Sequence, residues 1–441
     1  MKRNISFCKN TLMSIINEMT SVPWLFAEHP EKDFTRKSKI GFRNAVLFLL
    51  SSGAKSLQNE LLDFFGPDAD VPSSSAFVQC REKIIPEAFS FLLDEFTSRC
   101  CQVNTYRNYR LLAADGSDIQ IPTNPDDSDS FFTGPNCTKD FSLMHLNALY
   151  DINSHVYLDA ICEGRQISNE QNATARMIDR SAIKENVIIT ADRGYESYNL
   201  LAHVQNRKWK FLFRIKNGTG GIVSGLELPS SREFDVSFNI SLMHSDTKKA
   251  RELRKDRNRF KKLKDYHAFD LPLDCMHEGI QTYDLSFRIV RFVLSDNTVE
   301  TVITNLEPEE FPADEIRKLY GMRWGIETSF RKLKYSIGML SFHSRKTKSV
   351  IQEILAALIM YNFAEMTVSC TETKENCSRK HVYQTNFSAA VNICRQLFRD
   401  RMEPEHAESL ILRFIQPVRP GRKFQRNATH RKAVNFYYRI S

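Results

Sequence analysis

Four side chains of complementary chemistry lie at helical spacing in the last third of the chain. Tyr320, Arg323, Glu327 and Lys334 follow one another at intervals of three, four and seven residues. Because a helix turns by about 100° per residue, these intervals place all four on one face. The carboxylate could hold a metal ion through oxygen, while the two cations and the phenol could bind phosphate. The alternative is a solvated face with spaced ion pairs, and this segment alone does not decide.

The surrounding segment has the signals of one continuous helix from Pro312 to Gly338. A proline is tolerated in the first helical turn, and Asp314 and Glu315 suit the positive end of the helix dipole. Gly338 is a suitable C-terminal stop. We therefore expect a single helix to carry the four side chains.

Two aspartates follow apolar runs that are typical of buried strands. Asp115 ends the run 111–115 and precedes Gly116, and Asp192 ends the run 187–192. A short strand that ends in a carboxylate and then turns holds that carboxylate at the rim of a sheet, where α/β folds bind their ligands. A lone Asp-Gly is more often a simple turn, but two such acids and a helical glutamate favour a common site.

Three further acids lie near the same strands and rank below Asp115. Asp118 falls beyond the expected turn. Asp151 suits the bend of a hairpin between strands 143–151 and 155–160, and Asp159 lies in the second of these strands.

The spacing Tyr-x2-Arg-x3-Glu-x6-Lys resembles a motif of one large group of bacterial insertion-sequence transposases of the DDE type, and the resemblance covers roughly residues 111–363. It implies an RNase H-like catalytic domain in which Asp115, Asp192 and Glu327 are the catalytic, metal-binding acids. Two Mg²⁺ ions, for which Mn²⁺ would substitute, are the expected cofactors. The resemblance also implies that Tyr320, Arg323 and Lys334 contact DNA phosphates.

The activity implied by this resemblance is cut-and-paste DNA transposition. The enzyme would cleave double-stranded DNA at the terminal inverted repeats and join the freed 3′-hydroxyl ends to target DNA, working as a homodimer in a synaptic complex. No phosphate-binding GxxxxGK[ST] loop occurs, so a nucleotide cofactor is not expected. Two alternatives remain: an RNase H-like endonuclease without strand transfer, and a catalytically silent, transposase-derived DNA-binding protein.

Composition indicates a folded protein of two or three domains. The chain has 441 residues, of which 42% are hydrophobic, with only 16 Gly and 15 Pro. No apolar run approaches the length of a membrane span, so we expect a cytoplasmic protein without a membrane partner that associates with the nucleoid when bound to DNA. A net charge of +8 is moderate for this size and does not by itself indicate a polyanionic partner.

The periodicity predicts an α/β protein whose RNase H-like domain is interrupted by a mainly β insertion and flanked by helical regions. The expected parts are a helical, DNA-binding N-terminal region at 1–105, the catalytic domain at 106–216 and 301–366, a basic, β-rich insertion at 217–300, and a helical, basic C-terminal region at 367–441. Within the second catalytic part we expect an amphipathic helix at 350–366 that packs on the sheet.

Basic residues gather in two segments, 248–264 and the tail after Arg413. Such clusters can neutralise phosphates, although a solvated face or a loose tail has the same composition. In the N-terminal region, a third helix bearing Arg81 and Lys83 follows two others in an order compatible with a DNA-binding helix-turn-helix. Outside the motif helix face, the residues expected to contact DNA are Arg193, Arg331, Lys261, Lys262, Arg422 and Lys423.

Overall fold

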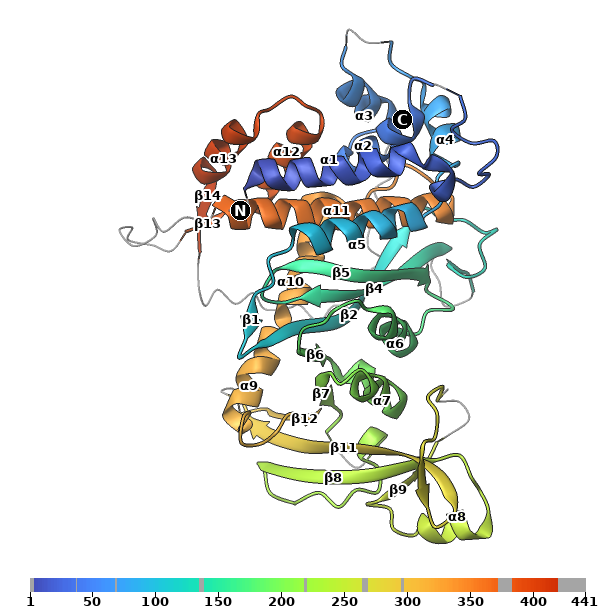
Figure 1. Ribbon diagram of the computed structural model, residues 1–441, viewed down its shortest axis with the longest axis vertical. Coiled ribbons are helices and arrows are strands. Elements are labelled where there is room, and N and C mark those ends of the chain that lie inside the picture. The colour runs from blue at the N-terminus through green and yellow to red at the C-terminus, as the bar shows by residue number, and fades with distance from the viewer. Residues whose placement is uncertain are drawn as a thin grey trace.

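The computed structural model describes residues 4–36, 38–67, 70–134, 139–217, 220–263, 269–294, 297–371 and 383–418. The protein is a mixed α/β structure in which a helical body lies on one end of a long twisted sheet (Figure 1). Both ends of the described chain contribute to the helical body, and the middle of the chain forms the sheet.

One large sheet supports the structure. Its strands are β1 (Thr105–Tyr106), β2 (Tyr109–Ile121), β3 (Phe131–Phe132), β4 (Phe141–Asp151), β5 (Val156–Gly164), β6 (Val187–Ala191), β7 (Lys210–Ile215), β8 (Phe234–Met243), β9 (Phe260–Lys262), β10 (Cys275–His277), β11 (Ile280–Val293) and β12 (Val299–Thr304). The order along the sheet is β3-β4-β2-β6-β7-β12-β11-β8-β9, with β5 on β4. Strands β2, β6 and β7 are parallel, and β4 and β5 run antiparallel to their neighbours.

The helices are α1 (Ile5–Ser21), α2 (Gly41–Ser51), α3 (Leu57–Phe65), α4 (Ser74–Arg81), α5 (Glu87–Cys100), α6 (Glu170–Arg180), α7 (Tyr198–Asn206), α8 (Lys248–Leu253), α9 (Ala313–Met322), α10 (Trp324–Lys332), α11 (Thr347–Thr371), α12 (Phe387–Phe398) and α13 (Pro404–Arg413). Short helical turns are η1 (Pro23–Phe26), η2 (Arg193–Tyr195), η3 (Gly221–Val223) and the π-helical η4 (Leu333–Ile337), and β13 (Tyr383–Thr385) pairs with β14 (Ile415–Pro417).

The segment from Pro312 to Gly338 is not the single continuous helix that we expected. Helix α9 ends at Met322, α10 begins at Trp324, and η4 follows α10. At the junction, the Arg323 N–H donates to the Tyr320 carbonyl (3.2 Å) and the Ile326 N–H to the Arg323 carbonyl (3.1 Å). These bonds span three residues instead of four, so the chain tightens at Arg323. Gly338 ends the segment as expected, with a left-handed backbone (φ 89°).

Helix α11 is buried on all sides, contrary to the expected amphipathic helix. It lies between α1 and the α5–β5 layer, and α2 and α12 also pack on it (Figure 1). The sequence was expected to have no segment resembling a membrane span, yet α11 is long and apolar enough for one, and 83% of its apolar window is buried inside the protein. Its buried Gln352 and Asn362 amides donate hydrogen bonds to carbonyls of Arg81 and Tyr157. These contacts are those of a central core helix.

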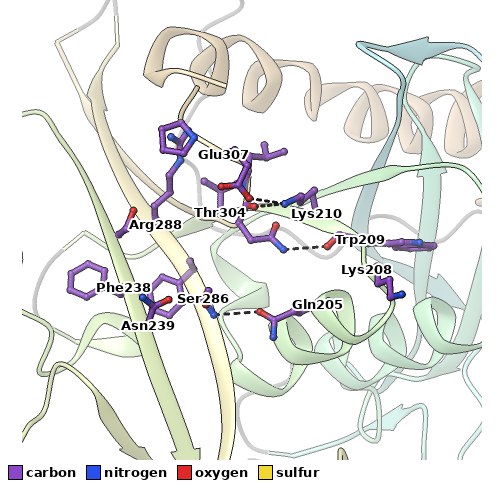
Figure 2. Close-up of a pocket in the computed structure, with 15 residues that line it drawn as sticks. Gln205, Lys208, Trp209, Lys210, Phe238, Asn239, Ser286, Arg288, Thr304 and Glu307 are labelled. Atoms are coloured by element: carbon purple, nitrogen blue, oxygen red, sulfur yellow. Dashed lines mark hydrogen bonds and ion pairs between the residues drawn. The ribbon is translucent and has the colours of Figure 1, made fainter. Parts of the chain in front are cut away.

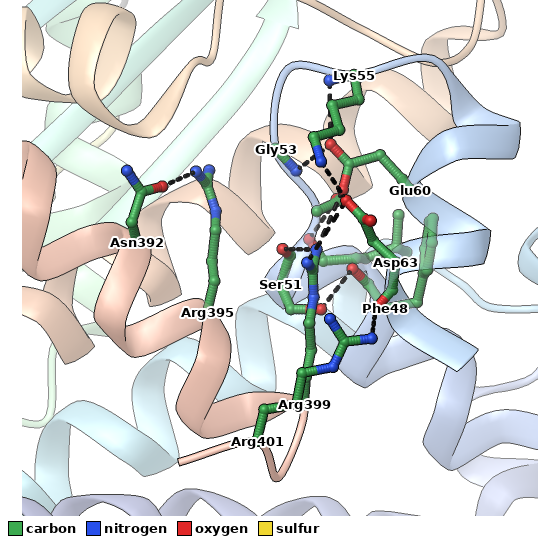
Figure 3. A network of polar contacts seen from close by, with 12 residues as sticks. Phe48, Ser51, Gly53, Lys55, Glu60, Asp63, Asn392, Arg395, Arg399 and Arg401 are labelled. Atoms are coloured by element: carbon green, nitrogen blue, oxygen red, sulfur yellow. Dashed lines mark hydrogen bonds and ion pairs between the residues drawn. The ribbon is translucent and has the colours of Figure 1, made fainter. Parts of the chain in front are cut away.

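The N-terminal and C-terminal helices pack into one body. Arg399, which follows α12, donates to the Ser51 carbonyl (2.9 Å) and to Glu60 Oε2 (3.1 Å) (Figure 3). The other Glu60 oxygen accepts the backbone N–H groups of Gly53 (2.9 Å) and Lys55 (3.0 Å). A charged pair taken out of water in this way needs such additional hydrogen bonds. The expected N-terminal and C-terminal regions are therefore in contact across α2, α3 and α12.

The segment expected to be an insertion contains β8 to β11 and α8, and its long strands extend the main sheet. Strand β11 pairs with β12 on one side and with β8 on the other, and β12 pairs with β7. The basic tail after residue 418, including Arg422 and Lys423, lies outside the described residues.

Candidate active site

Adjacent parallel strands bring the first two predicted acids together. The last paired residues of β2 and β6 are Ala113 and Thr190. Asp115 and Asp192 each lie two residues beyond that pair, so they lie side by side at the same edge. Contrary to expectation, β2 does not turn after Asp115 but continues to Ile121 along β4. Because β6 ends at Ala191, this side of β2 is open at Asp115.

Backbone N–H groups fix both carboxylates. Asp115 Oδ1 accepts the Gly116 N–H (2.9 Å), and Asp192 Oδ1 accepts the Gly194 N–H (2.7 Å) at the start of η2. Their orientations are therefore set by local backbone geometry.

Helix α10 packs on β2 and supplies the third acid, and the residue just before α10 supplies a guanidinium. Arg323 Nη2 donates to Glu327 Oε1 (2.7 Å), and Arg323 Nη1 lies 3.7 Å from Asp115 Oδ2. The guanidinium also lies over the Tyr320 and Trp324 rings, 5.7 and 5.4 Å from their centroids. With 5% of its side chain exposed, Arg323 is a fixed cation between two of the three acids.

The three acids act on one another electrostatically. The pKa of Asp115 is raised to about 7, chiefly by burial; the Gly116 N–H and Arg323 oppose the rise, and the negative charges of Asp192 and Glu327 add to it. Among the described residues, no group of three His, Cys, Asp or Glu side chains is placed to hold a metal ion as it lies. The three carboxylates nevertheless suit a hard divalent cation. Their negative charges repel one another, and a cation bound between their oxygens would relieve this repulsion.

A family model described as the transposase DDE domain matches residues 106–363. The chain belongs to this family and is a DDE transposase. None of the curated proteins searched matches the chain. Among solved structures, the chain is similar to a piggyBac transposase in a cryo-EM synaptic complex with hairpin DNA, with a TM-score of 0.47 and 13% identity over 95% of this chain and 87% of that one.

Some of the side chains predicted to bind DNA phosphates are buried in the transposase, and others are exposed. Tyr320 is buried, and its hydroxyl has no hydrogen-bond partner among the described residues. Lys334 Nζ donates to the Asp118 carbonyl (3.0 Å), and burial lowers the pKa of Lys334. Arg193 and Arg331 are exposed, as a contact with DNA requires.

A cavity of about 680 Å³ adjoins the second acid of the transposase, and its lining includes Asp192, Arg193, Lys216 and Lys262. Its cations come from three places: the η2 turn, the end of β7 and the insertion. Sequence reasoning missed Lys216. The signal was its position directly after the strand that follows β6, because neighbouring parallel strands end at the same edge of a sheet.

The insertion's lysines are partly engaged within the protein. Lys262 Nζ lies 3.2 Å from Asp246 Oδ2. Lys261 Nζ donates to the Ser224 carbonyl (2.7 Å), and burial followed by the nearby Arg257 charge lowers the pKa of Lys261 to about 8. Lys262 is therefore the more accessible of the two to a phosphate.

A second cavity of about 450 Å³ opens between α7, β7, β8 and β11, away from the acids (Figure 2). Its Lys210 pairs with Glu307 (3.1 Å), and its Arg288 pairs with Asp235 (3.3 Å). Because these two cations already face carboxylates, they offer less positive charge to DNA than Arg193 beside Asp192, which pairs with no carboxylate among the described residues.

Arg81, which the sequence places on the third helix of a possible helix-turn-helix, faces the protein interior. Its side chain is 1% exposed and bonds to Glu353 Oε1 (2.8 Å) and to the Ser349 carbonyl (2.7 Å) at the start of α11. The α4 helix thus turns its arginine into the protein. Lys83 remains half-exposed, with Asp33 at 3.9 Å.

Proposed function

We propose that this transposase cleaves double-stranded DNA at the terminal inverted repeats of a bacterial insertion sequence and transfers the 3′-hydroxyl ends into target DNA. The observation that carries the proposal is that Asp115 and Asp192 follow adjacent parallel strands at the same edge, while Arg323 joins Asp115 to Glu327 of α10. Cleavage and joining are both phosphoryl transfers that differ only in the nucleophile, so one set of acids can serve both. The four-residue spacing on α9, α10 and η4 supports membership of the Tyr-x2-Arg-x3-Glu-x6-Lys group.

We also propose that the catalytic domain is RNase H-like. The strand order β5-β4-β2-β6-β7, with three antiparallel strands followed by parallel ones, supports this layout. Helices α6 and α7 form the crossovers that the parallel strands require.

Asp115, Asp192 and Glu327 would hold divalent cations, in our proposal two Mg²⁺ ions, with Mn²⁺ as a substitute. Such ions, when bound, activate the attacking oxygen and stabilise the leaving oxygen in an in-line displacement. The protein's own contribution is to hold the three carboxylates and Arg323 in fixed positions. Nε and Nη1 of Arg323 are buried without a hydrogen-bond partner among the described residues, so Arg323 would donate to a phosphate only from inside the acid site.

DNA would approach across the cavity beside Asp192. Arg193, Lys216 and Lys262 line it, and Arg331 is exposed on α10. Cations along one face neutralise backbone phosphates without reading sequence. We propose that two protomers bind two ends in a synaptic complex, in the bacterial cytoplasm.

The proposal is tested by incubating the purified protein with DNA that carries the inverted repeats flanking its gene. Reactions contain Mg²⁺ or a chelator, and an Asp192→Ala variant runs beside the wild-type protein. We expect metal-dependent cuts at the repeat ends and joined products, both absent from the variant. Cutting without joining would indicate the endonuclease, and specific binding without cutting would indicate the catalytically silent descendant.

A further inference from the structure

A fourth carboxylate touches the backbone that follows both aspartates. Glu170 is the first residue of α6. A Cβ on Gly116 would lie 2.9 Å from Glu170 Oε1, and a Cβ on Gly194 would lie 3.3 Å from Glu170 Oε2. Gly116 directly follows Asp115, and the Gly194 N–H binds Asp192. One side chain therefore contacts the two glycines that orient the two aspartates.

A buried histidine packs against this carboxylate. His145 Nε2 lies 3.1 Å from Glu170 Oε1, and His145 Nδ1 lies 2.6 Å from Asp118 Oδ1. The imidazole is 3% exposed, and a Cβ on Gly116 would come within 2.4 Å of Nε2. Asp118 is in turn held by Arg165 (2.9 Å). His145 and Glu170 thus fill the space that only a glycine at position 116 leaves open.

The N-terminus of α6 also holds the turn after Asp192. Gln171 Nε2 donates to the Gly194 carbonyl (2.9 Å) and to the Glu196 carbonyl (3.4 Å). Gly194 is therefore in contact with α6 twice: its Cα faces Glu170, and its carbonyl accepts a hydrogen bond from Gln171. The helix and the turn are fixed relative to each other.

Tyr195 gives independent evidence that Glu170 belongs to the acid group. Its hydroxyl is buried and has no hydrogen-bond partner among the described residues. Besides burial, the charges of Glu170, Asp115 and Asp192 raise the pKa of Tyr195, with Glu170 first among the three. All three carboxylates therefore lie close enough to act electrostatically on one buried phenol.

A simpler reading is that Glu170 only supports its own helix. An acid in the first turn of a helix is favoured by the helix dipole. That reading explains neither its contact with glycines on two other elements nor the histidine packed behind it. It is tested directly by an aspartate at this position, which keeps the charge but shortens the reach.

We propose that Glu170 is a positioning residue of the transposase active site, which with His145 holds the backbone after Asp115 and after Asp192 and so sets how these two aspartates meet a divalent cation. The inference rests on the proposed metal-dependent function. Loss of residues that orient metal ligands typically lowers metal affinity by about 10–100-fold.

The experiment measures Mn²⁺ binding by calorimetry, so its readout does not depend on DNA cleavage. The variants are Glu170→Gln and Glu170→Asp. The matched control is Asp159→Asn, because the Asp159–Arg180 pair (2.5 Å) joins β5 to the other end of the same helix. Thermal unfolding of every variant is followed in parallel, and Asp192→Ala reports the binding that depends on the proposed centre.

We expect both Glu170 variants to bind Mn²⁺ about 10-fold more weakly than the wild-type protein, whereas Asp159→Asn binds normally. Normal affinity in Glu170→Asp, or an equal loss in Asp159→Asn, would overturn the positioning role while leaving the proposed function intact. If the wild-type protein binds no Mn²⁺, the metal centre and this inference fail together. If Glu170→Gln does not fold, the comparison of Glu170→Asp with Asp159→Asn decides.

Discussion

Arg323 Nη2 lies 2.7 Å from Glu327 Oε1, and this pair is made at the point where α9 gives way to α10. The tightened turn at Arg323 directs its guanidinium toward Asp115 as well as toward Glu327. A cation held in this way offsets the repulsion between Asp115 and Glu327. The irregularity in the helix is thus a feature of the site.

Replacing Glu327 with glutamine should separate chemistry from DNA binding. The amide keeps the size of the side chain but removes a metal-binding charge, so we expect cleavage of repeat-end DNA to fall by about 100-fold or more. Binding to the same DNA should change by less than about threefold, because no phosphate contact is lost. Single-turnover cleavage and gel-shift titrations measure the two quantities. An equal loss of both would place Glu327 in DNA binding.

The raised pKa of Asp115 predicts how the stability of the metal-free protein depends on pH. Between about pH 4, the ordinary pKa of an aspartate, and about pH 7, the unfolded chain releases this proton and the folded protein retains it. Stability therefore falls as pH rises through this window. Asp115→Asn removes the dependence, and above pH 7 we expect the variant to be more stable than the wild-type protein, by on the order of 4 kcal/mol.

Thermal unfolding in chelator at several pH values between 4 and 8 measures this difference. The two proteins should unfold alike at the acid end and diverge as the pH rises. A constant offset would show that the carboxyl is ionised in the folded protein at every pH tested.

Lys334 is predicted to contribute one phosphate contact despite its bond to the Asp118 carbonyl, because an ammonium has three donors. Lys334→Ala should weaken binding to the DNA ends. It should also make the slope of log K against log salt shallower by about 0.9, the contribution of one phosphate contact. Lys332→Ala is the matched control, since Lys332 pairs with Glu365 (2.6 Å) inside the protein. An unchanged slope in the Lys334 variant would assign it a structural role.

The three acids could be predicted from the sequence because their signals are local. Asp115 and Asp192 each follow a run of buried strand residues, and the interval from Arg323 to Glu327 is a property of any helix. Their convergence depended only on the two strands being parallel neighbours, which the alternation of strands and helices already favoured. The prediction that β2 ends at Asp115 failed because the termination of β6, not of β2, opens the edge there.

Other features depended on partners that no local pattern reveals. Arg81 is a cation on a short helix, as in a DNA contact, but it pairs with Glu353 of α11 and is buried there. The expectation of an amphipathic α11 failed because helices from both ends of the chain cover the face that would otherwise be solvated. Glu170 was passed over because its role depends on two glycines distant in sequence.

The last prediction concerns the contact between the N-terminal and C-terminal helices. Arg399 and Glu60 are 7% and 2% exposed, and their pair joins α12 to α3 (Figure 3). Arg399→Met should destabilise the protein by about 3 kcal/mol, because it leaves the Glu60 carboxylate buried without its cation. Adding Glu60→Gln should recover part of that loss, since the neutral amide needs no counter-ion and can still accept from Gly53 and Lys55.

Urea unfolding of the wild-type protein, both single variants and the double variant measures the coupling between the two residues. A surface pair, Arg99–Glu18, is the control and should contribute about 0–1 kcal/mol. Additive losses in the double variant would mean that Arg399 acts through its packing against Ser51 and not through Glu60. A double variant that recovers stability would show that the charge pair fastens the C-terminal helices to the N-terminal body.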